Sequence, residues 1–187
     1  MRIKEGVPDL KVNAWYLDDG TLCGSPSDLL KALEIIDEMG AQRGLNLNQS
    51  KSLLYIPPGG DTSENILPSE IPISRDGFTL LGCPIGPPNY CNDVLTKRVQ
   101  KVKEILSKLP ELKDSQMQVT LLRSCLALPK ISFSLRSCPP EYIEHATTSF
   151  DNLLRETLED LVGGPLSDWA WLKASLPSSR GDRKSVV

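Results

Sequence analysis

The sequence contains one histidine, few aromatic residues and no closely spaced pair of cysteines. Only 5% of the residues are aromatic, so a hydrophobic core has to be built mainly from Leu, Ile, Val and Ala. The cysteines are widely spaced and none belongs to a C-x-x-C pair: Cys23, Cys83, Cys91, Cys125 and Cys138. With His145 as the only histidine, no zinc-binding pattern is present. An odd number of scattered cysteines favours reduced thiols, which predicts an intracellular protein and leaves open whether it is cytoplasmic or nuclear.

Long hydrophobic runs and an excess of positive charge are absent as well. No apolar stretch approaches the length of a membrane span, and the N-terminal residues have no signal-peptide core. We therefore expect no association with a membrane. The 21 Lys and Arg residues are outnumbered by 24 Asp and Glu residues, which gives a formal net charge of -3. Nucleic-acid binding would thus require a local basic patch, because the charge of the whole chain does not favour it.

What is present is enough material for a folded protein. The 187 residues suffice for one large domain or two small ones, and 40% of them are hydrophobic, which is typical of globular proteins. Residues 10–24 predict a β-hairpin, because the turn-forming pair Asp19-Gly20 lies between two apolar runs.

A helix is predicted directly after this hairpin. Ser25 suits the N-cap, Pro26 the first helical position, and Asp28 the acidic position of a capping box. Gly44 suits the C-terminal cap. The apolar residues of the segment recur at helical spacing: Leu29, Leu33 and Ile36.

The remaining sequence predicts a few strands and then three helices. Residues 45–56 end in a strand-like apolar run, residues 57–72 have the composition of a surface loop, and residues 77–85 predict a second hairpin in which Pro84 indicates an edge strand or a bend. Helices are expected over residues 92–109 and from residue 114 or 115 onward with a kink at Pro129. A third helix is expected to begin at Pro139-Pro140-Glu141 and to stop at Gly163-Gly164, with these apolar residues at helical spacing: Tyr142, Ala146, Phe150, Leu153, Leu154, Leu158 and Leu161. Strands followed by helices predict an α+β fold.

The most informative motif is the run Trp15-Tyr16-Leu17-Asp18-Asp19-Gly20. Adjacent carboxylates repel each other, and a divalent cation relieves that repulsion. Carboxylate oxygens of this kind bind Mg²⁺ together with substrate phosphates. A plain hairpin turn explains the same residues, and a hairpin tip can also present a carboxylate, so the two interpretations stay open.

A second motif is a cluster of positive charges in the first predicted helix of the C-terminal half. It consists of Lys97, Arg98, Lys101, Lys103 and Lys108. This is the best candidate for a basic patch that binds nucleic acid. An ordinary solvated helix face has the same composition, and on the sequence alone that is the simpler interpretation.

Three blocks, taken together and in order, resemble a known family. They are the aromatic-x-Asp-Asp run at residues 16–19, then Gly44-Leu45-x-Leu47-Asn48-x-x-Lys51, then Leu80-Leu81-Gly82-x-x-Ile85-Gly86. The blocks resemble the third, fourth and fifth palm motifs of reverse transcriptases, above all those of non-LTR retrotransposon-like mobile elements. Residues 121–130 and 138–140 are similar to the helical region that follows the palm, and the likeness covers most of residues 10–177.

The resemblance implies roles for individual residues. Asp18 corresponds to a carboxylate that binds the catalytic Mg²⁺ ions, Asp19 to its partner, Tyr16 to an aromatic residue beside the primer terminus, and Lys51 to a lysine near the leaving pyrophosphate. The resemblance further implies a hairpin that grips the primer and a thumb that follows the nucleic-acid backbone, with these residues: Leu81, Gly82, Ile85, Gly86, Lys97, Arg98 and Lys101. Mg²⁺ would be the cofactor and an RNA/DNA primer–template the partner. Without the resemblance, Tyr16 is equally well a sheet-packing residue and Lys51 an ordinary surface lysine.

Two family motifs have no counterpart in the sequence. Family members carry another metal-binding Asp on an earlier strand, followed by a Gln-Gly motif, whereas the only acidic residues before Asp18 are Glu5 and Asp9. We therefore expect a truncated domain that binds Mg²⁺ weakly, is inactive alone and has the missing N-terminal half of the polymerase as a possible partner.

The expected organisation is a partial palm over residues 1–90, a helical thumb-like region over residues 91–164 and a partly disordered tail over residues 165–187. The palm part would hold a small antiparallel sheet with one packed helix. The expected function is that of a truncated RNA-directed DNA polymerase domain. The alternatives are a non-catalytic nucleic-acid-binding remnant and a degraded retroelement product without function.

Overall fold

The computed structural model describes residues 3–60 and 68–176, which form two compact units, Met1–Asp76 and Gly77–Val187. The fold is mixed α+β, as predicted, with 58% of residues in helices and 12% in strands, so that helices dominate. All sheets in the described parts have two strands: β1 with β2, β3 with β4, and β5 with β6. The hairpin at residues 78–85 belongs to the same unit as the long helices, whereas the sequence interpretation grouped it with the first sheet.

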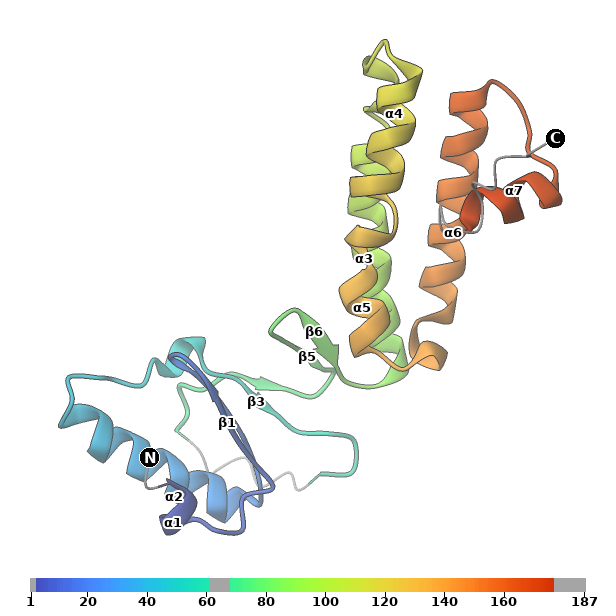
Figure 1. The fold of residues 1–187 in the computed structure, drawn as a ribbon. Coiled ribbons are helices and arrows are strands. Elements are labelled where there is room, and N and C mark those ends of the chain that lie inside the picture. The colour runs from blue at the N-terminus through green and yellow to red at the C-terminus, as the bar shows by residue number, and fades with distance from the viewer. Residues whose placement is uncertain (1–2, 61–67, 177–187) are drawn as a thin grey trace. The chain divides into compact units, whose positions relative to one another are not determined.

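Among its described residues, the first unit contains one long helix and two small sheets, which can be followed in Figure 1. Its elements in chain order are α1 (Ile3–Gly6), β1 (Val12–Tyr16), β2 (Asp19–Cys23), α2 (Pro26–Ala41), the 3₁₀ turn η1 (Gln49–Lys51), β3 (Leu54–Tyr55) and β4 (Ile73–Ser74). The strand predicted at the end of residues 45–56 is β3, which pairs in parallel with β4. The expected loop at 57–72 lies partly outside the described residues.

Helix α2 begins and ends where its capping residues predict. The Ser25 hydroxyl accepts a hydrogen bond from the Asp28 N–H at 3.2 Å and donates one to the Asp28 carboxylate at 2.6 Å. Regular helix stops at Ala41, but Gly44 is left-handed (φ +71°), its N–H donates to the Ala41 carbonyl, and the next N–H, of Leu45, donates to the Gly40 carbonyl. These two bonds form a Schellman motif, so Gly44 is the terminating glycine that the sequence predicts.

The core of the first unit is small. Ile3, Val7 and Ala32 are buried, and these partly buried side chains pack against them: Leu10, Leu22, Ile35 and Ile36. The stripe predicted on α2 is therefore shifted, since Leu29 and Leu33 are only half-buried and Ala32 lies at its centre. The sequence prediction missed this because alanine contributes little to an apolar pattern.

The second unit is a short hairpin followed by helices (Figure 1). Its elements are β5 (Phe78–Leu80), β6 (Cys83–Ile85), α3 (Pro88–Leu106), the 3₁₀ turn η2 (Leu109–Glu111), α4 (Ser115–Leu121), the π-helical turn η3 (Leu122–Leu126), the 3₁₀ turn η4 (Leu128–Lys130), α5 (Ser132–Ser137), α6 (Pro140–Val162) and α7 (Asp168–Ser175). The second hairpin and all three predicted helical segments are present. Helix α3 starts at Pro88, four residues before the predicted start, because proline suits the first turn of a helix.

The long helices α3 and α6 pack against each other and form the main core. Their buried side chains follow one stripe on each helix, which includes Leu95 (0% exposed) and Phe150 (1% exposed). The Asn92 Oδ1 accepts a hydrogen bond from the main-chain N–H of Ala146 at 3.1 Å, which fixes the register of the two helices at one end. The predicted apolar positions of the third helix therefore face the core, as expected.

The helical segment after Asp114 is interrupted near the proline that predicts a kink. Asp114 caps α4 by accepting a hydrogen bond from the Met117 N–H at 2.9 Å. The α-helix then widens into the π-helical turn η3, and the backbone leaves helical geometry at Ala127 (φ -80°, ψ -122°), two residues before Pro129. Since the ring of a proline clashes with the preceding turn, the break precedes Pro129 rather than coinciding with it.

The end of α6 is joined to α7 by a small polar network. Gly163 terminates α6 with φ +78°, as predicted. Arg155 contacts Glu159 at 3.2 Å, the Leu166 carbonyl at 2.7 Å and Asp168 at 3.0 Å, while Glu159 also accepts the Leu166 N–H at 3.0 Å. The expected tail at 165–187 thus contains a helix, and its residues 177–187 lie outside the described residues. No helix of the described residues is both long and apolar enough to cross a bilayer.

Candidate functional site

The two adjacent carboxylates lie at the tip of the first hairpin. Strands β1 and β2 pair in antiparallel register down to Tyr16 opposite Asp19, which leaves Leu17 and Asp18 as a two-residue loop. The hairpin is therefore as predicted, but its turn is Leu17-Asp18 and not Asp19-Gly20. Leu17 has a positive φ of 57°, which is the pattern of a type II′ turn, where glycine is normally preferred.

The reason for this shift lies in the packing of Trp15. Gly20 is the cross-strand partner of Trp15, and a Cβ atom on Gly20 would lie 2.7 Å from two atoms of the indole ring. The indole Nε1 donates to the Asn13 side chain on the same face at 2.8 Å. Because Gly20 has no side chain, the indole ring packs directly on its backbone within the β1–β2 pair. The turn is made by Leu17 and Asp18 instead.

The opposite face of this hairpin is open. Side chains alternate along a strand, so Tyr16 and its cross-strand partner Asp19 lie on the face of the hairpin opposite to that of Leu22. Leu22 packs into the core beside α2, whereas Tyr16 is 64% exposed, and Asp18 and Asp19 are exposed as well. The predicted site residues of this motif are therefore brought together on an accessible surface.

Two carboxylates are not a complete site for catalytic metal ions. Within residues 3–60 and 68–176, no group of three or more His, Cys, Asp or Glu side chains is arranged to hold a metal. Asp18 and Asp19 alone could hold a hydrated Mg²⁺ that keeps most of its waters. A two-metal centre needs further oxygen ligands.

Lys51 belongs to a separate piece of the first unit. It ends the 3₁₀ turn η1, and its N–H is capped by the Asn48 side chain at 3.2 Å. Its own side chain is exposed, and no ion pair connects it with Asp18 or Asp19 in the described part of the chain. The structure therefore gives Lys51 a defined backbone but does not join it to the carboxylates.

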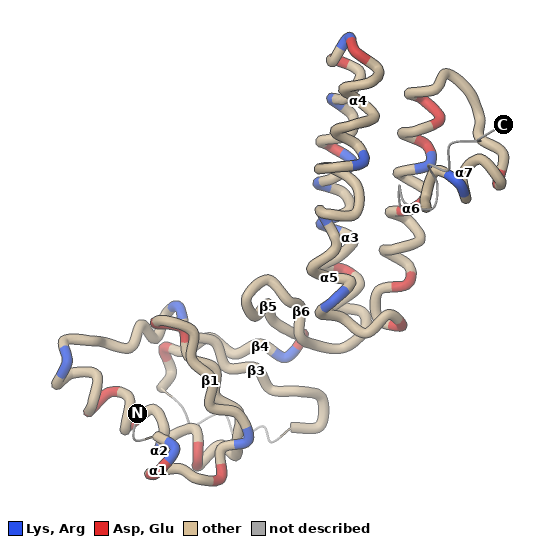
Figure 2. The backbone as a smooth tube through the Cα atoms, viewed as in Figure 1, with Lys and Arg blue, Asp and Glu red and all other residues tan. Residues whose placement is uncertain are grey.

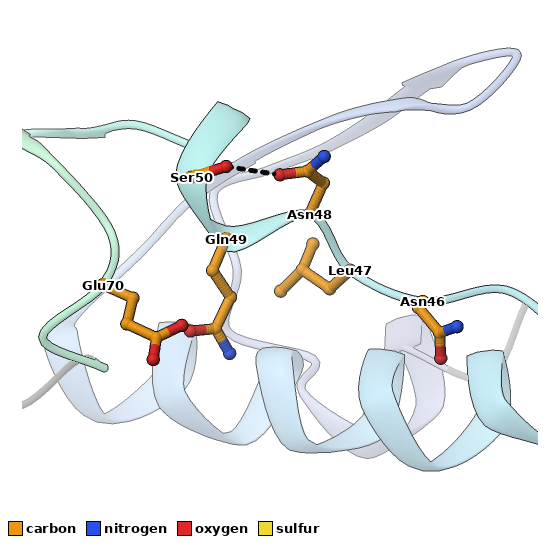
Figure 3. Close-up of a pocket in the computed structure, with 6 residues that line it drawn as sticks. All are labelled: Asn46, Leu47, Asn48, Gln49, Ser50 and Glu70. Carbon is orange, nitrogen blue, oxygen red and sulfur yellow. Dashed lines mark hydrogen bonds between the residues drawn. The ribbon is translucent and has the colours of Figure 1, made fainter.

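A polar hollow of about 460 Å³ lies beside η1. It is lined by Asn46, Leu47, Asn48, Gln49, Ser50 and Glu70. Figure 3 shows the Gln49 side chain extending toward Glu70 and the hydrogen bond of 2.9 Å from Ser50 to Asn48. Its lining is mostly amide and hydroxyl groups without a cationic side chain, so it does not by itself indicate a phosphate site.

The second hairpin presents an exposed apolar tip. Leu81 and Gly82 form its two-residue loop, both with positive φ (48° and 84°), which is the pattern of a type I′ turn. Leu81 is 63% exposed, and Ile85 and Gly86 lie at the other end of β6, where they are half-buried. The four residues predicted to contact a primer are thus split between an open tip and a packed base.

The basic residues of α3 have two different environments. Lys97 and Lys101 are exposed on the side of α3 opposite its buried stripe. Arg98 is half-buried, and its guanidinium donates to the Ser134 hydroxyl and to the Gly82 carbonyl. Arg98 therefore supports the hairpin tip, while the two lysines are available to solvent.

Charge is unevenly distributed within the second unit. Residues 88–137 contain nine Lys and Arg against four Asp and Glu, whereas residues 140–162 contain six Asp and Glu against one Arg. Figure 2 shows the positive residues mainly along α3 to α5 and the negative ones along α6. The local basic patch that the sequence requires for nucleic-acid binding is thus on the α3 side of this unit.

Sequence reasoning missed two groups of side chains. The contacts of Arg155 include an i, i+4 pair with Glu159, which helical spacing could have indicated. The approach of Cys138 to Cys83 and Cys91 had no such indication, because Cys138 is far from the other two in the sequence.

The candidate site residues are divided between the two units. The first unit holds Tyr16, Asp18, Asp19 and Lys51, and the second unit holds the second hairpin and α3. Comparison of the chain with protein-family models, with curated proteins and with solved structures found no match.

Proposed function

We propose that the chain carries palm and thumb elements of an RNA-directed DNA polymerase of the kind found in non-LTR retrotransposon-like elements. The observation that carries the proposal is the first hairpin, in which an exposed tyrosine and two exposed carboxylates surround a two-residue turn. In the family that the sequence blocks resemble, such a hairpin brings an aromatic ring and carboxylates that hold metal ions to the primer terminus. The second hairpin, the α3 lysines and the order of the three sequence blocks support the same assignment.

The residues present do not fit a complete two-metal centre. Asp18 and Asp19 have no third metal-ligating side chain beside them in the described residues. The proposal for this chain therefore concerns how the primer–template is held. Tyr16 would pack on the terminal base or sugar, Leu81 would contact the primer strand, and Lys97 and Lys101 would neutralise phosphates.

Photochemical cross-linking tests this proposal without requiring turnover. A DNA primer with a photoreactive 3′-terminal base, annealed to an RNA template, is irradiated with the full chain, and the adducts are mapped by mass spectrometry. We expect adducts at Tyr16 or at Leu81-Gly82. The adduct at Tyr16 should be lost in the variant Tyr16→Ala. Tyr142→Ala, on α6, is the matched control and should leave the adducts unchanged. Adducts confined to α6 or α7 would contradict the proposal.

Primer extension with Mg²⁺ tests the expected lack of activity. We expect no incorporation by this chain alone, because its two carboxylates lack further ligands. Incorporation that disappears in Asp18→Asn but persists in Asp28→Asn would show that the expectation of inactivity is wrong, while supporting the polymerase assignment.

A non-catalytic nucleic-acid-binding role is the second candidate, and the uneven charge of the second unit favours it. Duplex binding measured by fluorescence anisotropy should weaken as salt rises. The double variant Lys97→Glu/Lys101→Glu should weaken it further and reduce the salt slope by about 2, roughly one per lysine. Lys173→Glu on α7 is the control. Binding that is insensitive to salt would exclude this role.

A further inference from the structure

Three thiols, one of them distant from the other two in the sequence, meet at the base of the second hairpin. Cys83 is in β6, Cys91 is in the first turn of α3, and Cys138 directly follows α5. The Sγ atoms of Cys83 and Cys91 approach the same acceptor, the Pro84 carbonyl, at 3.5 and 3.7 Å. None of these thiols has a part in the proposed polymerase role.

Cys83 and Cys138 are neighbours within this cluster. The Cys83 Sγ lies 3.4 Å from the main-chain carbonyl of Ser137, the residue before Cys138. Burial raises the pKa of the Cys138 thiol above its usual value, and the nearby Cys83 thiol raises it further. Cys91 lies 3.6 Å from the Gly86 carbonyl, and burial, followed by the nearby Cys138 and Cys83 thiols, raises its pKa.

The three thiols differ in access to solvent. Cys83 is half-buried, whereas Cys138 is 6% exposed and Cys91 is 2% exposed. A small reagent in solution therefore meets Cys83 first. Cys138 is then placed to attack the same sulfur from inside the protein, which is the arrangement of an attacking and a resolving cysteine.

We propose that Cys83 and Cys138 form a redox-responsive thiol pair whose oxidant is a low-molecular-weight disulfide such as oxidised glutathione. The Cys83 thiolate attacks one sulfur of the oxidant and expels one small thiol, which takes up a proton. The Cys138 thiolate then attacks the Cys83 sulfur of the mixed disulfide and expels the second small thiol. Two protein thiols are oxidised to one disulfide, and the small disulfide is reduced to two thiols.

The resulting bond would join β6 to the connection between α5 and α6. The tip of the same hairpin is already held by Arg98 through the Gly82 carbonyl and Ser134 of α5. Oxidation would thus add a covalent link to a contact that is otherwise made by hydrogen bonds, and the hairpin would lose freedom to move on the helices. This inference does not depend on the proposed polymerase role.

Thiol mapping tests the pair. The full chain with Cys23→Ser and Cys125→Ser, which removes the two exposed thiols, is incubated with oxidised glutathione, quenched with N-ethylmaleimide and analysed by intact-mass and peptide mass spectrometry. We expect loss of two of the three remaining thiols, a mass lower by about 2 Da before alkylation, and a cross-linked peptide that joins Cys83 to Cys138. Amides of residues 78–85 should exchange more slowly with deuterium after oxidation.

Two further variants make the assignment specific. Adding Cys91→Ser should leave the cross-link unchanged, whereas adding Cys138→Ser should leave Cys83 as a stable mixed disulfide with glutathione. A Cys83–Cys91 cross-link, a persistent mixed disulfide at Cys83 in the chain that keeps Cys138, or no reaction at Cys83 would each overturn the proposal. The mapping in the Cys23→Ser/Cys125→Ser chain tests the Cys83–Cys138 pair by itself. The proposal is therefore decided even when a further variant misfolds.

Discussion

Arg98 of α3 donates a hydrogen bond from its guanidinium to the main-chain carbonyl of Gly82, at the tip of the β5–β6 hairpin. The same guanidinium reaches the Ser134 hydroxyl, which is 1% exposed. A residue that the sequence suggests as a nucleic-acid contact therefore also holds a turn in place. The planar fork of arginine can serve both acceptors at once, which a lysine ammonium on a flexible stem does less well.

Replacement of Arg98 should destabilise the second unit. We expect Arg98→Lys to lower the free energy of unfolding by about 1–3 kcal/mol. The substitution removes hydrogen bonds from a charged donor, and the buried Ser134 hydroxyl loses the guanidinium that donates to it. Urea denaturation followed by circular dichroism measures this change. The exposed neighbour supplies the control, since Lys97→Ala should stay within about 0.5 kcal/mol. Equal effects of the two substitutions would contradict the assigned role of Arg98.

The turn of the second hairpin should be improved by asparagine. Leu81 has a φ of 48° and an exposed side chain, so its substitution sacrifices little packing. Asn-Gly is the preferred pair for a type I′ turn, and we expect Leu81→Asn to stabilise the unit by roughly 1 kcal/mol. Leu81→Val, which places a β-branched residue in the left-handed region, should act in the opposite direction. Thermal denaturation of the two variants compares them; a shift of the same sign in both would show that the turn is not the cause.

The attachment of α7 should depend on pH through Glu159. The Leu166 N–H and then Arg155 hold the pKa of Glu159 below its usual value of 4.5. A carboxyl group with a lowered pKa in the folded state stabilises that state above pH 4.5, and this contribution is lost as the pH falls through the lowered value. We therefore expect α7 to loosen on the acidic side of pH 4.5.

Tryptophan fluorescence can follow this loosening. Trp169 and Trp171 are both in α7, so the variant Trp15→Phe confines the emission to that helix. Its emission should shift to the red below pH 4.5, and Glu159→Gln should show shifted emission already at neutral pH. Glu156→Gln, at an exposed position of α6, is the control. Emission that follows the same acid titration in Glu159→Gln as in the parent would assign the effect to another group.

The core between α3 and α6 should be the most sensitive to truncation. Phe150 is 1% exposed, and Phe150→Ala is expected to cost about 3–5 kcal/mol, because the substitution removes apolar contacts and leaves a cavity. Phe133→Ala removes a ring of equal size that is 50% exposed and should cost much less. Equilibrium unfolding in urea gives both values. Similar losses would mean that the stripe on α6 is not the principal core.

Local sequence signals predicted the architecture well because their physics is local. Ser25 with Asp28, Gly44 and Gly163 act within one turn of chain, and each does in the structure what its residue type predicts. The position of the first turn could not be predicted in this way. It depends on Trp15 packing across the strands on Gly20, a contact that moves the loop to Leu17-Asp18 against the preference for glycine.

The candidate site was predictable only as far as it lies in one hairpin. Tyr16, Asp18 and Asp19 share a motif, so their proximity follows from the sequence, but Lys51 lies in another segment and its relation to them does not. The contacts of Arg98 and the thiol cluster join residues brought together by helix packing, which no spacing rule describes.

The two-residue loops of both antiparallel hairpins also bear on how the chain folds. A hairpin with so short a loop closes in about 1–10 μs, because almost no chain has to be ordered first. The α3–α6 core requires closure of the whole segment 107–139, and this entropy is lost before the helices gain contact. The β5–β6 hairpin should therefore form early in refolding, and the environment of Trp169 and Trp171 in α7, which follows α6, should report the slower docking of the helices.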